Sequence, residues 1–228
     1  MTQATTPTQP PQVFLVGCRS GDNAGASPDA MGFKAYNLWR MHGVGLKVPQ
    51  AFVLGTRYCR DYLEHGRTPP ADLRETLARY IREVERASGL GFGSSRKPLL
   101  VSVRSGAPVS MPGMLDTVLN IGLCDSTVPG LVRLTGHPRL VWDNYRRLVQ
   151  SFAETVHGSS PEPFEAALGR HLASASAASV DELDFQDLRA LTREHLDLFE
   201  KHARRAFPQQ PIEQLEAAVA AVFEFCSG

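Results

Sequence analysis

Three short apolar runs stand out in the first half of the chain, each bounded by polar or glycine-rich segments. They cover residues 13–17, 51–55 and 97–104 and are rich in valine, leucine and phenylalanine, which predicts strands. We expect these strands to form one small sheet. The run at 97–104 is apolar enough to be a central strand.

A second pattern, with apolar residues three or four positions apart, predicts helices. Its clearest example in the first half is residues 71–88, where Leu73, Leu77, Ile81 and Val84 share one face. After residue 124 the helical period dominates, and no strand signal of comparable strength appears. The predicted helices cover residues 31–43, 56–65, 71–88, 138–157, 164–173, 183–207 and 212–225.

These elements predict an α/β (α+β) fold, in which helices pack on a small mixed sheet and a helical subdomain is inserted. We expect an α/β nucleotide-binding subdomain over 13–124, a helical subdomain over 125–207, and a C-terminal part, 208–228, whose helix returns to the α/β subdomain. Residues 1–12 are mostly threonine, glutamine and proline, and we expect a disordered tail there.

The formal charges balance, with 24 basic and 24 acidic residues. This balance gives no electrostatic signature of a nucleic-acid or membrane partner, although a small phosphorylated ligand needs only one or two cations. The four cysteines are far apart and form no CxxC pair, which favours reduced thiols in a cytoplasmic protein. No run resembles a secretion signal or a membrane span.

The stretch VSVRSGAPVSMPGMLDTVLN, residues 101–120, begins as a strand and then breaks. Arg104 comes at the strand end, where a firmly held guanidinium can bind a phosphate through two parallel hydrogen bonds. Gly113 lets the backbone approach a ligand, and Met111 and Met114 supply apolar cover. The residues alone leave a second interpretation open, in which Arg104 meets a surface carboxylate and the glycines only form turns. Neither GxxxxGK[ST] nor GxGxxG occurs in this stretch.

This stretch closely resembles a signature of the N-terminal nucleotide-binding domain of pyruvate phosphate dikinase. Two further segments are similar to that family, GVGLKVPQAFVLGTRYC at 43–59 and TGHPRLVWDNYRRLVQSF at 135–152. The resemblance extends from about residue 31 to the C-terminus and is weakest between about 158 and 207.

The resemblance implies the first part of an ATP-grasp domain that uses ATP and Mg²⁺. In the family, this domain passes the β-phosphoryl group of ATP to a histidine on a swivelling domain, which then phosphorylates pyruvate in a barrel domain. The products are AMP, phosphoenolpyruvate and diphosphate. The implied partners of this chain are therefore ATP or ADP and those further domains, or an equivalent partner.

The resemblance also implies a set of site residues. Arg104 stands at the family's triphosphate-binding arginine, and Lys34 stands at the lysine of a Gly-Gly-Lys-Gly element that reaches the phosphates. The family's glycine-rich phosphate loop corresponds to 111–117, which includes Met111, Gly113, Met114, Asp116 and Thr117. No catalytic residue and no metal ligand is assigned to this chain.

The sequence departs from the family pattern in three ways. Phe33 and Ala35 replace glycines beside Lys34, and a bulky phenylalanine there can block close approach to a phosphate. Pro108 occupies a position that is usually basic in close relatives. The family's domain also continues beyond the part matched here, and that second half carries the acidic Mg²⁺ ligands and part of the adenine pocket. We therefore expect the isolated chain to be inactive.

Other polar residues carry weaker signals. None of the seven histidines has the surroundings of the family's phosphorylated histidine, and His195 and His202, which share a helix face, are expected at the surface or half-buried. Asp143, Arg146 and Arg147 are expected to form local ion pairs on a solvated face, although contact with a ligand or a docking domain stays open.

Two functional classes remain at this point. The chain is either the leading part of a dikinase-like phosphotransferase or a shortened, non-catalytic relative that binds a nucleotide or a protein partner. The nearly intact stretch at 101–120 favours the first class.

Overall fold

The computed structural model describes residues 13–18, 23–105 and 117–225, which divide into two compact units along the chain at Ala71 and Asp72. The expected subdomain boundaries, at 124 and 207, both fall within the second unit and stay predictions. The expected tail at 1–12 lies outside the described residues. No described helix is long and apolar enough to span a membrane.

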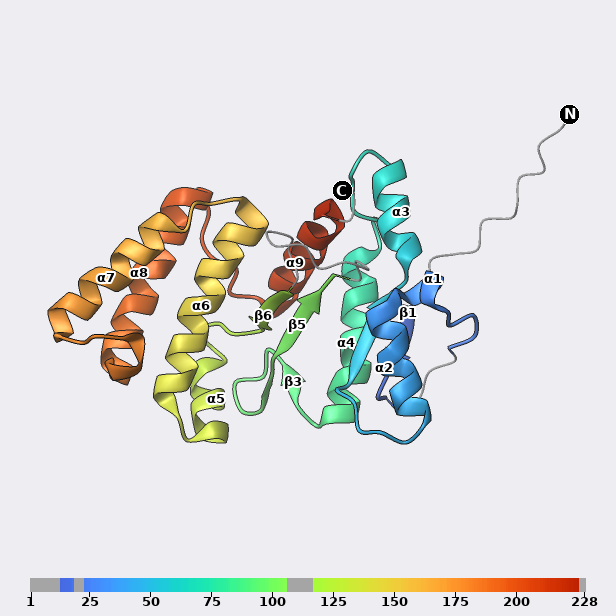
Figure 1. Cartoon of the computed structure of the whole chain (residues 1–228), viewed down its shortest axis with the longest axis horizontal. Helices are drawn as coiled ribbons and strands as arrows, with labels where there is room; N and C mark the ends of the chain where they lie inside the picture. The colour runs from blue at the N-terminus through green and yellow to red at the C-terminus, as the bar shows by residue number, and fades with distance from the viewer. Residues whose placement is uncertain (1–12, 19–22, 106–116, 226–228) are drawn as a thin grey trace, which may run out of the picture. The chain divides into compact units, whose positions relative to one another are not determined.

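The first unit pairs two strands and packs short helices against them (Figure 1). The predicted strands at 13–17 and 51–55 are confirmed and form an antiparallel pair, with Phe14 opposite Val53. Phe14, Val16 and Met31 form the buried core of this unit, against which Trp39 packs. Its elements are β1 (Val13–Val16), α1 (Pro28–Met31), α2 (Phe33–Gly43), β2 (Ala51–Leu54) and α3 (Thr56–Glu64).

A break at Gly32 divides the single helix predicted over 31–43. Gly32 has a φ of 78°, a left-handed conformation that a helix interior does not tolerate, so α1 ends there and α2 begins at Phe33. The Ser27 hydroxyl caps α1 by accepting a hydrogen bond of 3.1 Å from the Ala30 N–H.

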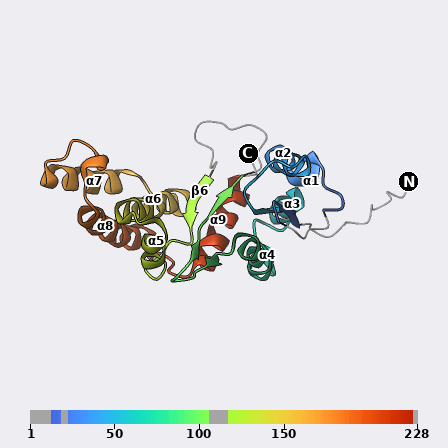
Figure 2. The same cartoon turned by 90° about the horizontal axis from the view of Figure 1, so that it is seen from below.

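The second unit joins a small β-region to a group of helices (Figures 1 and 2). Its strands are β3 (Gly91–Phe92), β4 (Pro98–Leu99), β5 (Val101–Arg104) and β6 (Thr117–Ile121). Its helices are α4 (Leu73–Ser88), α5 (Val128–Thr135), α6 (Pro138–His157), α7 (Glu162–Ala175), the 3₁₀ turn η1 (Val180–Glu182), α8 (Phe185–Ala203) and α9 (Pro211–Phe225). The sequence pattern missed α5, β3 and β6.

The prediction of one small sheet is wrong for the described residues, which form three separate two-stranded sheets. β1 pairs with β2, β3 runs parallel to β4, and β5 runs antiparallel to β6. The predicted third strand is interrupted at Leu100, so its first part pairs with β3 and its second with β6. An apolar run identifies a strand, but the choice of partner depends on residues distant in sequence, here β6 with buried Val118 and Ile121.

Aromatic side chains fill the centre of the helical group. α6 packs along α8, and α8 also contacts α7. Phe152 of α6, Phe199 of α8 and Phe207 meet with ring centroids 5.3–6.1 Å apart, a spacing typical of favourable aromatic pairs. The helical stripe predicted over 138–157 is confirmed to the residue by α6.

Helix α9 packs against β5, β6, α4 and α6. It does so with an apolar face that includes the buried Leu215, Ala218 and Val222. The β5–β6 hairpin therefore has a solid support on one side, which fixes the backbone at the candidate site.

Candidate functional site

The β5–β6 hairpin holds the two ends of the signature stretch. Arg104 is the last residue of β5 and lies opposite Thr117, the first residue of β6. The Arg104 Nε–H donates a hydrogen bond of 3.3 Å to Thr117 Oγ1. This bond uses one of the five N–H donors of an exposed guanidinium. The pair thus joins the two points at which the chain leaves and re-enters the hairpin.

A β-bulge on β6 sets the register of this pair. Val101 lies opposite Ile121, whereas Val103 lies opposite Val118, so β6 carries one extra residue between the two pairs. Asn120 lies in this interval with a φ of 60°, and asparagine tolerates that left-handed conformation better than most residues. Without the extra residue, every β6 side chain beyond it would change face.

A buried glutamine ties the hairpin to α9. Gln214 is fully buried, and its Oε1 accepts a hydrogen bond of 2.9 Å from the Gly122 N–H, just after β6. Its Nε2 donates to the carbonyls of Leu123, at 2.9 Å, and Pro208, at 2.7 Å. One side chain therefore satisfies three buried backbone groups and connects the strand end, the α8–α9 connection and α9 itself.

The turn after β6 has little space for a side chain. Gly122 has a φ of 111°, and a Cβ atom there would lie 2.9 Å from the Leu99 carbonyl oxygen. The Thr127 hydroxyl donates to the Gly122 carbonyl at 2.9 Å and accepts from the Cys124 N–H at 2.9 Å. These contacts make Gly122, Cys124 and Thr127 structural residues of the hairpin.

The expected ion pairs on α6 are confirmed, but the expected solvated face is wrong for two of the three residues. Asp143 and Arg146 are buried, whereas Arg147 is exposed. Asp143 Oδ1 accepts from Arg146 Nη2 at 2.7 Å, and Asp143 Oδ2 lies 2.8 Å from Arg147 Nε. One carboxylate thus holds two guanidinium groups, because residues three and four apart on a helix share a side.

His195 is a second correction. Its side chain is fully buried, whereas the sequence predicted a place at the surface or half-buried; His202 is exposed, in agreement with that prediction. The His195 ring meets the Phe164 ring edge-on, with centroids 5.1 Å apart. Burial, assisted by the nearby charge of Arg146, lowers the pKa of His195 to about 4. His195 is therefore a neutral core residue at neutral pH.

Lys34 belongs to the first unit, and Arg104 to the second. Lys34 is exposed in the first turn of α2, next to Phe33, whose side chain is 60% exposed. Each residue is therefore placed within its own unit, and their convergence on one ligand stays a prediction.

Four of the expected site residues, Met111, Gly113, Met114 and Asp116, lie outside the described residues. Thr117 is described and contacts Arg104, as stated above. Within the described parts of the chain, no group of three or more histidine, cysteine, aspartate or glutamate side chains could hold a metal ion.

Comparison with known proteins identifies relatives along nearly the whole chain. It is 38% identical over 207 residues to pyruvate, phosphate dikinase of Entamoeba histolytica, covering 91% of this chain and 23% of that protein. It is 38% identical over 211 residues to the enzyme of the same name from Rhizobium meliloti, covering 92% and 24%. The chloroplastic pyruvate, phosphate dikinase of Mesembryanthemum crystallinum is 37% identical over 227 residues, covering 98% and 24%.

No protein-family model matches the chain. The chain spans about a quarter of the length of the curated relatives it matches. The resemblance noted from the motifs is thus confirmed by similarity over more than nine tenths of this chain. Over nearly its whole length the chain is therefore similar to the N-terminal region of pyruvate, phosphate dikinases.

Proposed function

We propose that this chain supplies the triphosphate-binding part of the nucleotide site in a dikinase-like phosphotransferase. The single observation that carries the proposal is the Arg104–Thr117 pair at the strand ends. It is supported by relatives named for a reaction with pyruvate and phosphate. The overall reaction would convert ATP, pyruvate and phosphate to AMP, phosphoenolpyruvate and diphosphate.

The geometry suits a phosphate in a specific way. The bond from Nε to Thr117 fixes the plane of the guanidinium and leaves its two terminal nitrogens for the ligand. Two parallel N–H donors match two oxygens of one phosphate group, and the planar fork loses little freedom on binding. The exposed position of Arg104 lets a nucleotide reach it.

Metal binding and phosphoryl transfer to a histidine are assigned to regions that this chain does not span. Mg²⁺, when bound, would neutralise charge on the phosphates, and carboxylates are the ligands that it prefers. Asp116 is the only acidic residue of the signature stretch. We therefore propose that this chain binds and orients the phosphates, while the metal ligands and the phosphorylated histidine come from regions of the relatives that this chain does not span.

The test is nucleotide affinity of the Arg104→Ala variant. The substitution should weaken ADP binding by about 1.5–3 kcal/mol, roughly 10- to 150-fold, the range of hydrogen bonds to charged groups. Titration of the 228-residue chain followed by NMR detects weak affinities. Lys34→Ala should cost less, because Phe33 and Ala35 restrict its approach to a phosphate.

The control is Arg82→Ala, which removes an exposed arginine from α4 of the same unit. It should leave the affinity unchanged. An Arg104→Ala affinity within twofold of the parent, or an absence of saturable binding by the parent chain, would refute the phosphate role of Arg104.

A further inference from the structure

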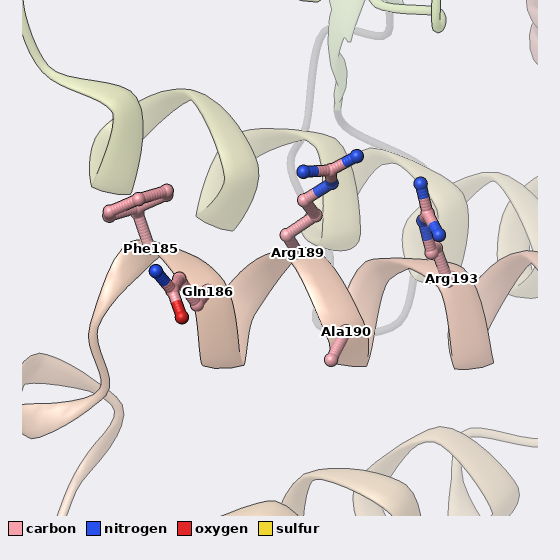
Figure 3. A pocket seen from close by; sticks show the side chains of 5 residues that line it. All are labelled: Phe185, Gln186, Arg189, Ala190 and Arg193. Carbon is pink, nitrogen blue, oxygen red and sulfur yellow. The ribbon is translucent and has the colours of Figure 1, made fainter.

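One side of α8 carries an open hollow of about 590 Å³ that the proposed nucleotide site does not use. It is lined by Phe185, Gln186, Arg189, Ala190 and Arg193. Figure 3 shows Phe185, Arg189 and Arg193 projecting from successive turns of α8 towards the same side. The spacing of four residues between them accounts for this alignment.

The two arginines of the hollow differ in their ion pairs from several other arginines of the helical group. Arg170 pairs with Glu194, and Arg147 pairs with Asp143. Among the described residues, by contrast, no carboxylate lies within ion-pair distance of Arg189 or Arg193. Two like charges four positions apart repel each other and destabilise a helix slightly. An anion bound between them would therefore relieve this repulsion.

Aromatic side chains border this pair of charges. The Arg189 guanidinium lies over the half-buried Trp142 ring of α6, 5.7 Å from its centroid, and Phe185 is 40% exposed. A cation held on an aromatic face loses less freedom when it binds a carboxylate. The surface thus combines a fixed positive charge, a second positive charge about 6 Å further along the helix axis, and exposed apolar area.

The sequence limits which molecule can bind at this surface of α8. The segments outside the described residues contain only two acidic side chains, Asp22 and Asp116, in separate segments. Neither segment can supply two neighbouring carboxylates. The balanced charge of the chain does not favour a nucleic-acid partner either.

We propose that this surface binds an acidic protein segment that is not part of these 228 residues. In that segment two carboxylates lie about 6–7 Å apart, as alternate residues of an extended strand do, and an apolar residue two positions after the second carboxylate lies on the same face. The carboxylates pair with Arg189 and Arg193, and the apolar residue contacts Phe185. Recognition depends on charge complementarity and on two similar spacings: about 6 Å between Arg189 and Arg193 along α8, and about 6–7 Å between the two carboxylates of the bound strand.

The test uses a short fluorescein-labelled peptide containing Glu-Leu-Glu-Leu-Phe, with Gln-Leu-Gln-Leu-Phe as its matched control. Anisotropy should rise with the acidic peptide only, and the rise should weaken as salt is added. Arg193→Gln should weaken binding about threefold, and the double variant with Arg189→Gln about tenfold, as for exposed ion pairs. Arg193 is the cleaner site, because Arg189 also contacts Trp142.

Reversing the charge of Arg193 gives a second test. It predicts a gain of binding to a basic peptide, which a loss of folding cannot produce. Arg193→Glu should lose the acidic peptide and gain a Lys-Leu-Lys-Leu-Phe peptide, while Arg82→Gln changes neither. Equal binding of the acidic and amide peptides, or unchanged binding by the double variant, would overturn the proposal. Complete displacement by millimolar inorganic phosphate would replace it with a small-anion site. Self-association that Arg193→Glu abolishes would instead identify a second copy of this chain as the occupant.

Discussion

At the scale of single residues, Gln214 supports the candidate site most directly. Gln214→Ala removes hydrogen bonds to Gly122, Leu123 and Pro208 in a buried position, and we expect a loss of about 3 kcal/mol in the free energy of unfolding. Gln209 is the matched control, because it is exposed although it also bonds to Asp125. Its alanine variant should lose about 1 kcal/mol or less in urea unfolding. Equal losses would show that Gln214 is not the anchor of the hairpin.

His195 makes a prediction about pH at the same scale. Its pKa in the folded chain, about 4, lies below the ordinary value of 6.5, so the unfolded chain binds the proton more readily. The free energy of unfolding should therefore be unaffected by His195 above pH 7 and should fall by about 2 kcal/mol between pH 7 and pH 5. Urea unfolding of the parent and of His195→Gln measures this contribution as the part of the pH slope that the variant lacks. An identical slope in both proteins would contradict it.

At the scale of elements, the β6 bulge determines which residue faces Arg104. Asn120→Val forces a β-branched residue into a left-handed conformation and should cost about 1–3 kcal/mol. Asn120→Gly should be tolerated, because glycine adopts that conformation freely. Ser102→Val, at an exposed strand position, is the control and should be nearly neutral. Urea unfolding measures all three, and a tolerated Asn120→Val would mean that the bulge can shift to another residue.

At the scale of the whole molecule, we expect this chain to bind a nucleotide without catalysing the overall reaction. We expect the isolated chain to form no pyruvate-dependent AMP from ATP, Mg²⁺, phosphate and pyruvate, since it spans about a quarter of the length of its relatives. Chromatographic detection of AMP after long incubation measures this, with one of the full-length relatives as the positive control. Clear turnover would show that this part of the family protein carries more of the catalytic machinery than we assign to it.

The sequence by itself determined most of the long helices, the first strands and the resemblance to pyruvate, phosphate dikinases. Helix α6 was predicted to the residue, because its apolar stripe recurs with the helical period for twenty residues and Pro138 and Gly158 bound it. The signature stretch indicated this resemblance, because it sets an arginine after an apolar run and two glycines close behind it. Arg104 was placed correctly at a strand end, because the preceding apolar run is local information.

Only the tertiary structure decided the pairing of strands and the state of buried polar groups. β6 has a short and mixed pattern, and its partner is chosen by the hairpin, the bulge at Asn120 and the support of α9. His195 lies on the same face of α8 as the buried Leu188, Leu191 and Phe199, but a histidine does not by itself indicate burial, and only packing against the Phe164 ring of α7 showed it. Gln214 gave no signal at all, because its role depends on three backbone groups that folding brings to it. Periodicity records which face of an element is apolar, whereas partners far apart in the sequence are set by packing.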